Sequence, residues 1–439
     1  MNKFTESIKT VVLWLLFAIA IALVAIRYTD FGNTKSDAIS PFLNQRYFKQ
    51  MLLPSHIIVS FDNLSKTQIL NKQSNYYDEA IENLVQAFSS KKSFEEVELS
   101  TFDTLSSSKM VSFIFNNFPG SIFGLVTGIN DNDLTSRDNI VGIHFAIGEN
   151  TIFIQTDKKI FSLLSERING FSSVDSLMET NYQRYVPIFY PMNSNKNLLL
   201  PIKPDIYMQD LASVNLLNDT NISEIAKNIF NEKFDFTSSI VQKNGIYFYS
   251  YNNGEQILEI SKNGHIKYKS SANISNSNDY TKAATALSKF LVDAKINPDL
   301  IKIKKIYKFN DNGTEKIRFE MVGKYLGIDL VTGNKSYVDV VNSDVVDANL
   351  SLIYAAPYSS EFNSLIDPKD ALSDNIDVLK KFLMVDDSTQ LLKQIRDFNL
   401  NYLFDDMSGN YIPCWSFEIG GYIFYFDGIS GEMVHYAMD

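Results

Sequence analysis

Two short motifs in the chain match those of serine enzymes that form acyl intermediates. Ser106-Ser107-Ser108-Lys109 has the Ser-x-x-Lys spacing that places a lysine one helical turn from a nucleophilic serine, and Ser373-Asp374-Asn375 matches the Ser-Asp-Asn triplet of penicillin-recognising enzymes. The Lys-Thr-Gly strand that completes such a site does not occur in the sequence, and the two motifs fall in separate predicted domains. Serine-rich loops often contain Ser-x-x-Lys, as residues 89–92 also do, so we do not interpret the two motifs as an active site.

The residue types that bind metals do not have metal-binding spacing here. Asp131-Asn132-Asp133 resembles the start of a calcium loop, but Ser136 stands where that loop requires glycine and Gly142 where it requires a bidentate glutamate. Cys414, the only cysteine, has no histidine beside it. The four histidines are far apart in the chain: His56, His144, His265 and His435. The sequence therefore predicts no metal, no cofactor and no catalytic residues, and it favours a binding protein over an enzyme.

Composition narrows the class of protein further. A chain of 439 residues is long enough for about three domains. Hydrophobic residues make up 45% of it and aromatic residues 13%, which favours folded, sheet-rich domains. Acidic residues outnumber basic ones by 51 to 40, a net charge of −11, which argues against nucleic acid as a partner. A single cysteine excludes an internal disulfide.

An uncharged stretch near the N-terminus predicts a transmembrane helix over residues 10–27, preceded by a short tail over 1–9. The run from Thr10 to Ile26 is near the lower length limit for crossing a bilayer, and a snorkelling Lys9 extends it. A cleaved signal peptide is the alternative, but its small-residue cleavage site would lie within the apolar run, at Ala20-Ile21-Ala22. We therefore predict an uncleaved, single-pass anchor in the cell membrane.

The anchor also suggests an orientation and a surface for a partner helix. The tail is too short to fold, so we expect it in the cytoplasm and the large C-terminal part outside the cell. Small residues recur on one face of the helix, where a second helix could approach closely. This predicted partner-binding face consists of Trp14, Ala18, Ala22 and Ala25, although alanine is also common in membrane helices that have no partner.

The predicted fold class is α+β, with a polar juxtamembrane linker over 28–50 and an N-terminal α+β domain over 51–180. Periodicity predicts an amphipathic helix over 76–88 in this domain and a second helix that starts at Pro119. Strands are predicted at 56–61, 67–70, 94–99, 109–115, 140–146 and 151–155. Four prolines then predict a connector of short strands and turns over 181–235: Pro187, Pro191, Pro201 and Pro204.

Two similar C-terminal modules are predicted over 236–360 and 361–439. The sequence Phe319-Glu-Met-Val-Gly323 recurs as Phe417-Glu-Ile-Gly-Gly421, and each copy follows a helix and precedes two further strands. This repeat indicates tandem modules of a helix and an antiparallel sheet. In the first module, Asn263-Gly264 predicts a tight hairpin turn in which both residues take positive φ.

The last strands carry a resemblance to known families. Residues 415–434 resemble the closing strands of PepSY-type modules, with a tyrosine-rich strand followed by an Asp-x-x-Ser-Gly-Glu turn. Three features together resemble the YycH/YycI family, accessory proteins of the WalK/WalR cell-wall two-component system of Gram-positive bacteria. They are the anchor that begins at Glu6-Ser7-Ile8-Lys9, the strand after Leu53-Pro54-Ser55 with the strand–Pro–helix stretch over 113–129, and the doubled C-terminal module.

This resemblance implies a regulator and not an enzyme. Its expected partners are a WalK-like sensor histidine kinase, a YycI-like companion protein and the membrane lipid around the helix. One alternative of a different class stays open: an extracytoplasmic PepSY-type module that restrains a secreted peptidase or binds cell-wall polymer.

Overall fold

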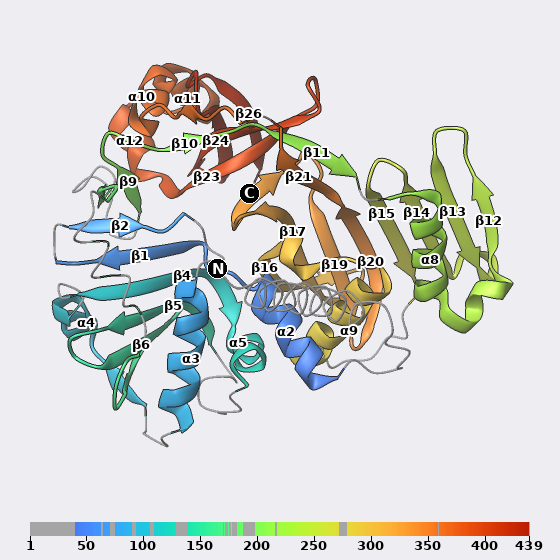
Figure 1. Cartoon of the computed structure of the whole chain (residues 1–439), viewed down its shortest axis with the longest axis horizontal. Helices are drawn as coiled ribbons and strands as arrows, with labels where there is room; N and C mark the ends of the chain where they lie inside the picture. The colour runs from blue at the N-terminus through green and yellow to red at the C-terminus, as the bar shows by residue number, and fades with distance from the viewer. Residues whose placement is uncertain are drawn as a thin grey trace, which may run out of the picture.

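A computed structural model describes residues 40–438, apart from 63–64, 71–74, 90–93, 106–108, 129–137, 170, 172–173, 175–176, 178–181, 188–197, 216, 272–278 and 359. Within this part of the chain, no helix is both long and apolar enough to cross a membrane. The predicted tail, the transmembrane helix and its face of Trp14, Ala18, Ala22 and Ala25 lie outside the described residues. The α+β class is confirmed for the rest, which consists largely of antiparallel sheets covered by helices (Figure 1).

The N-terminal unit is an antiparallel sheet with helices on both faces. Its strand order is β3-β7-β6-β5-β4-β1-β2-β8-β9. Helices α3 (Asn75–Ser89) and α5 (Gly120–Thr127) pack against one face, and Phe102 of α4 (Leu99–Leu105) packs against Phe153 on the other. Both predicted helices are confirmed. The strands are β1 (His56–Ser60), β2 (Lys66–Gln68), β3 (Glu95–Val97), β4 (Met110–Pro119), β5 (Asn139–Ala146), β6 (Thr151–Thr156), β7 (Ile160–Leu164), β8 (Tyr185–Pro187) and β9 (Leu199–Pro201).

The first C-terminal module begins with a meander and continues into a larger sheet. The order β12-β13-β14-β15-β20-β19-β17 brings its strands together, with β16 on the other side of β17. Helices α8 (Asp219–Phe230) and α9 (Tyr280–Asp293) bury apolar residues in the same core. The strands are β12 (Ser238–Val241), β13 (Ile246–Tyr251), β14 (Gln256–Ser261), β15 (His265–Ser270), β16 (Ile301–Asp311), β17 (Thr314–Tyr325), β18 (Ile328–Val331), β19 (Ser336–Val341), β20 (Asp344–Ser351) and β21 (Ile353–Pro357); short 3-10 helices are η1 (Asn231–Phe236), η2 (Asn252–Gly254) and η3 (Pro298–Leu300).

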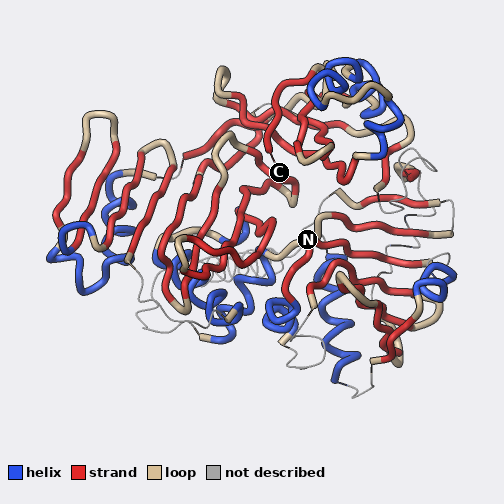
Figure 2. Tube along the Cα trace, turned by 180° about the vertical axis from the view of Figure 1, so that it is seen from behind, coloured by secondary structure: helices blue, strands red, loops and turns tan. Residues whose placement is uncertain are grey.

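The second C-terminal module has a separate core. Helices α10 (Pro368–Asp374), α11 (Ile376–Leu383) and α12 (Ser388–Lys393) gather at one end of the molecule (Figure 2). Its strands are β23 (Ile395–Asp405), β24 (Asn410–Ile419), β25 (Tyr422–Asp427) and β26 (Met433–Met438). Strand β18 pairs in parallel with β23 and thereby joins the two modules. Strand β11 (Leu211–Asn215) bridges β24 and β21, and β10 (Tyr207–Met208) pairs with β22 (Asn363–Ser364).

Strand pairing confirms the predicted internal repeat. Each module pairs four main strands in sequence, β16-β17-β19-β20 in the first and β23-β24-β25-β26 in the second. Both copies carry bulges at matching positions. Lys304 is the extra residue opposite Glu320–Met321, and Arg396 is the extra residue opposite Glu418–Ile419. A second matching bulge interrupts β19–β20 and β25–β26. The two modules therefore share details of register that chance similarity of five residues would not produce.

Two helices lie where the sequence had predicted irregular chain. Residues 41–50, which we predicted to belong to the polar linker, lie in helix α2 (Pro41–Met51). The Ser40 side chain accepts a hydrogen bond from the backbone N–H of Leu43, and Pro41 occupies a first-turn position, so the start of α2 is a favourable cap. The predicted connector does contain short strands, but it ends in α8, which is capped by Asn218.

The hairpin predicted at Asn263-Gly264 is present as β14–β15, but its turn differs from our prediction. Gly264 has a φ of +89°, whereas Asn263 is not among the residues with positive φ. The loop between the strands has three residues. The Gly264 N–H donates a hydrogen bond to the Ser261 carbonyl and thereby closes the turn. Such loops combine an ordinary turn with one left-handed glycine, so only the glycine needs positive φ.

Candidate functional site

The segments that resemble serine-enzyme and calcium-loop motifs do not form a common site in the described structure. Ser373 and Asp374 end helix α10, and the Asn375 amide donates hydrogen bonds to the carbonyls of Ala371 and Gly431. Lys109 precedes β4 in the N-terminal unit, while Ser106 and the Asp131–Asp133 segment lie outside the described residues. The Asn375 side chain therefore has a structural role, because it links the end of helix α10 to the turn at Gly431.

The histidines and the cysteine lie on different strands. His56, His144, His265 and His435 belong to β1, β5, β15 and β26 respectively. Cys414 is fully buried, and burial raises the pKa of its thiol far above the ordinary value. Among the residues that the structure describes, no group of three or more His, Cys, Asp or Glu could hold a metal ion.

His144 is a buried polar residue on the face of the N-terminal sheet covered by α4. Its Nε2 lies 3.2 Å from Gln155 Oε1 and its Nδ1 lies 2.9 Å from Ser112 Oγ. Because the amide oxygen of Gln155 can only accept, Nε2 carries the proton and Nδ1 accepts from the Ser112 hydroxyl. Burial lowers the pKa of His144 to about 4, because the imidazolium form would be separated from water.

This pKa makes stability depend on pH in a defined window. The unfolded histidine takes up a proton near pH 6.5, whereas the folded one does so only near pH 4, so acidification through this range favours unfolding. We expect His144 to lower the free energy of unfolding by about 2–3 kcal/mol between pH 7 and pH 4.5. Urea unfolding of wild type and His144→Gln at both pH values measures this. Equal losses in the two proteins would contradict the prediction.

Helix α2 lies at the junction between the N-terminal unit and the first C-terminal module. Toward the N-terminal unit, Gln45 Nε2 donates to the carbonyl of Val126, 3.1 Å away. Toward the module, the Asn44 side chain donates to Thr285 Oγ1 at 3.0 Å and accepts from Ser288 Oγ at 2.6 Å. Asn44 and Ser288 are both buried, so neither could lose its partner without a cost in stability.

The far end of α2 is held by a buried lysine. Lys324 Nζ, on β17, donates to the carbonyl of Gln50 at 2.5 Å. A cation next to the last carbonyls of a helix is favoured by the helix dipole. Sequence reasoning missed α2 and all its contacts. The Ser40-Pro41 pair, a good N-cap followed by proline, was the signal that could have revealed the helix.

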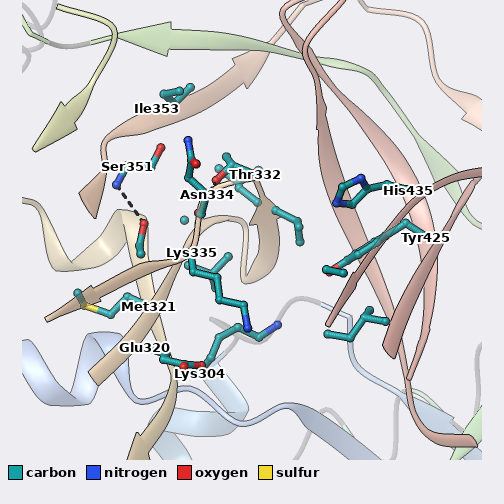
Figure 3. Close-up of a pocket in the computed structure, with 18 of the residues that line it drawn as sticks. Lys304, Glu320, Met321, Thr332, Asn334, Lys335, Ser351, Ile353, Tyr425 and His435 are labelled. Atoms are coloured by element: carbon teal, nitrogen blue, oxygen red, sulfur yellow. Dashed lines mark hydrogen bonds between the residues drawn. The ribbon is translucent and has the colours of Figure 1, made fainter. Parts of the chain in front are cut away.

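A pocket of about 260 Å³ opens where the sheet of the first module divides. Residues 317–321 of β17 pair with β19, whereas residues 323–325 pair with β18, so the two partner strands separate there. Figure 3 shows Lys304 and Lys335 on one wall, and Tyr425 and His435 on the opposite wall, which belongs to the second module. The buried Ser351 hydroxyl at this pocket has no hydrogen-bond partner within the described structure.

A second cavity of about 500 Å³ adjoins this pocket and shares four of its lining residues, Lys304, Lys305, Ile423 and Tyr425. We call this second space the junction cavity, because all three units line it. The N-terminal unit contributes Asn116 and Asn117, and the modules contribute Lys304, Arg396, Asn399 and Tyr425. The pocket and the junction cavity together form a groove between the modules.

Ion pairs and a hydrogen bond fix the walls of the junction cavity. Lys302 Nζ lies 3.2 Å from Asp329 Oδ1, with both side chains buried, and the partly exposed Lys304 lies 3.7 Å from the same carboxylate. On the opposite wall, His56 Nε2 lies 2.9 Å from Asp397 Oδ1, which ties the N-terminal unit to the second module. Gln68 Nε2 is 2.8 Å from His56 Nδ1 and can only donate, so His56 Nε2 is the atom that donates to Asp397. The three units are thus joined by polar contacts around one polar space.

The fold and the groove define the class of protein: an α+β protein of three joined units, two of which are copies of one helix-and-sheet module. No family model matches the sequence, and no curated protein matches it either. Among solved structures, the crystal structure of YycH from Bacillus subtilis matches with a TM-score of 0.59 and 13% identity, over 86% of this chain and 96% of that one. The chain therefore has the fold of YycH over most of its length.

Two further structures match parts of the chain at lower similarity. An uncharacterized protein from Eubacterium rectale matches with a TM-score of 0.36 and 15% identity, over 55% of this chain and 92% of that one. The C-terminal domain of YpeB from Bacillus megaterium matches with a TM-score of 0.31 and 12% identity, over 51% of this chain and 97% of that one.

Proposed function

We propose that this protein is a membrane-anchored, extracytoplasmic regulator that binds a sensor histidine kinase and modulates a two-component system. The observation that carries the proposal is the YycH fold over 86% of the chain. The apolar segment over 10–27 supports an anchor, and the resemblance to the YycH/YycI family supports a WalK-like kinase and a YycI-like companion as partners.

Helix α2 lies between the predicted anchor and the rest of the exterior part along the chain. It begins at Pro41, after the predicted anchor and the polar residues 28–40, and it contacts both the N-terminal unit and the first module. A regulator shifts a kinase between conformations only by binding one of them more tightly, and a difference of about 1–3 kcal/mol gives graded control. Attachment of α2 to both units fixes the point at which the chain coming from the predicted anchor enters the exterior.

The proposal predicts that the small-residue face of the anchor contributes to kinase binding. Ala18→Leu and Ala22→Leu together should weaken association about tenfold, because close helix packing in membranes contributes about 1–2 kcal/mol. Co-purification of the full-length chain with the kinase from membranes measures this. Ala20→Leu, on another face of the same helix, is the matched control and should bind as the wild type does.

Two outcomes would count against the proposal. One is the absence of any kinase association by the full-length protein. The other is a deletion strain in which kinase output is unchanged while a secreted peptidase or wall binding is altered, which would favour the PepSY-type alternative. Unchanged association of the Ala18→Leu, Ala22→Leu protein would show that this face of the helix does not bind the kinase. The rest of the proposal would stand, because the exterior could then make the contact with the kinase.

A further inference from the structure

Three backbone irregularities, one from each unit, converge on the junction cavity. In the first module the bulge at Lys304 places this residue out of the regular pairing, and in the second module the bulge at Arg396 does the same. In the N-terminal unit the pairing of β4 with β5 is interrupted between Ile114 and Phe118, which displaces Asn116 and Asn117. Asn117 takes a φ of +58° there, a conformation that few residues other than glycine and asparagine adopt.

Bulges cost regular hydrogen bonds, and proteins often use them to redirect a side chain at a functional site. Here the displaced residues are two cations and two amides, and all four line the same cavity. The two cations occupy equivalent positions in the repeated module, and both line this one cavity. A purely structural role would not require that all three bulges face the same polar cavity.

The chemistry of the lining indicates what the cavity could hold. Lysine ammonium and arginine guanidinium groups bind carboxylate and phosphate oxygens. Asparagine amides can both donate to and accept from hydroxyl groups. The cationic residues in the wall outnumber the carboxylates; they are Lys302, Lys304, Lys305 and Arg396 against Asp329, Asp397 and Glu418. Tyr425 adds an aromatic ring at the boundary with the adjoining pocket. A volume of about 500 Å³ is in the range of small-molecule sites.

We propose that the junction cavity binds a small anionic carbohydrate, with Lys304 and Arg396 at its carboxylate or phosphate and the asparagine amides at its hydroxyl groups. Such a ligand contacts the N-terminal unit and both modules at once, and it therefore favours the arrangement of the units seen here. This inference is independent of the kinase proposal, because it concerns a ligand of the exterior alone.

The test is calorimetric titration of the full-length protein in detergent with defined sugars. The probes are glucuronate, glucose 1-phosphate, glucose and inorganic phosphate. We expect saturable binding of at least one anionic sugar, at least tenfold tighter than binding of glucose or of inorganic phosphate. Preference for glucuronate would assign a carboxylated ligand, and preference for glucose 1-phosphate a phosphorylated one.

Substitutions test whether the sugar binds in the junction cavity. Lys304→Ala and Arg396→Ala should each weaken binding of the preferred sugar at least tenfold. Lys304→Gln and Arg396→Gln, which keep a polar side chain without its charge, should do so as well. Lys267→Ala is the matched control, because Lys267 is an exposed strand lysine of β15 away from the cavity. Unliganded variants should melt at the wild-type temperature. The proposal is overturned if no sugar binds saturably, if glucose binds as tightly as the anionic sugars, or if the folded cavity variants bind like the wild type.

Discussion

Phe48→Ala is expected to lower the free energy of unfolding by about 3–5 kcal/mol, the range for removing a large aromatic side chain from a packed core. Phe48 lies on α2 and is fully buried. Its ring lies edge-on to Phe319 of β17, with the ring centroids 6.3 Å apart. Alanine would leave a cavity between the helix and the sheet of the first module. The shift of the urea unfolding midpoint of the full-length protein in detergent measures the loss.

The same helix provides a matched control. Phe42 lies one turn and a half earlier on α2, and its side chain is 75% exposed. Phe42→Ala removes the same atoms at a surface position, where substitutions usually change stability by less than about 0.5 kcal/mol. If both variants lost the same stability, α2 would not be packed as described, and its proposed role between anchor and exterior would fail with it.

The strands and the repeat could be predicted from sequence because their signals are local. The amphipathic helix over 76–88, the strand before Pro119 and the helix after it follow from residue patterns within single elements. The Phe319 and Phe417 segments could be matched because both occupy an inner strand of a module, in which Phe319 and Phe417 are fully buried. Local patterns and tertiary packing agree at these positions.

Helix α2 was missed in the sequence analysis because the residues that stabilise this helix lie far away in the sequence. The Asn44 side chain accepts a hydrogen bond from Ser288 and the Gln50 backbone carbonyl accepts one from Lys324, and both donors are more than two hundred residues further along the chain. A short helix has little stability of its own, and packing supplies most of it. The Ser40-Pro41 cap was visible, but it indicates only where a helix could start.

The groove could not be predicted for a related reason. A bulge belongs to a pair of strands, so the sequence around Lys304 or Arg396 carries no signal that either residue leaves the regular pairing. The repeat was detected through the strand opposite these residues, at Glu320 and Glu418. Aligning the two copies would have placed the cations at equivalent sites, but only the strand pairing shows that they line one cavity.

Lys324 is expected to make the docking of α2 dependent on pH. Burial lowers the pKa of Lys324 to about 7 from an ordinary value of 10.5, because the ammonium form is separated from water; Asp299 and Asp329 partly oppose this shift. Between these two pH values the unfolded chain binds one more proton at this residue than the folded chain does. Raising the pH therefore favours folding, by up to about 1.4 kcal/mol per pH unit.

Comparison with Lys324→Met isolates this effect, since methionine has a similar volume and does not titrate. From pH 7 to pH 10, the wild type should gain up to about 4 kcal/mol relative to the variant, and urea unfolding at both pH values measures the gain. Other titrating groups, including the buried tyrosines, cancel in the difference between the two proteins. Parallel pH profiles would show that Lys324 is accessible to water when folded. In that case its hydrogen bond to Gln50 would be a surface contact, and α2 would be held by the contacts of Asn44 and Gln45 and by the burial of Phe48.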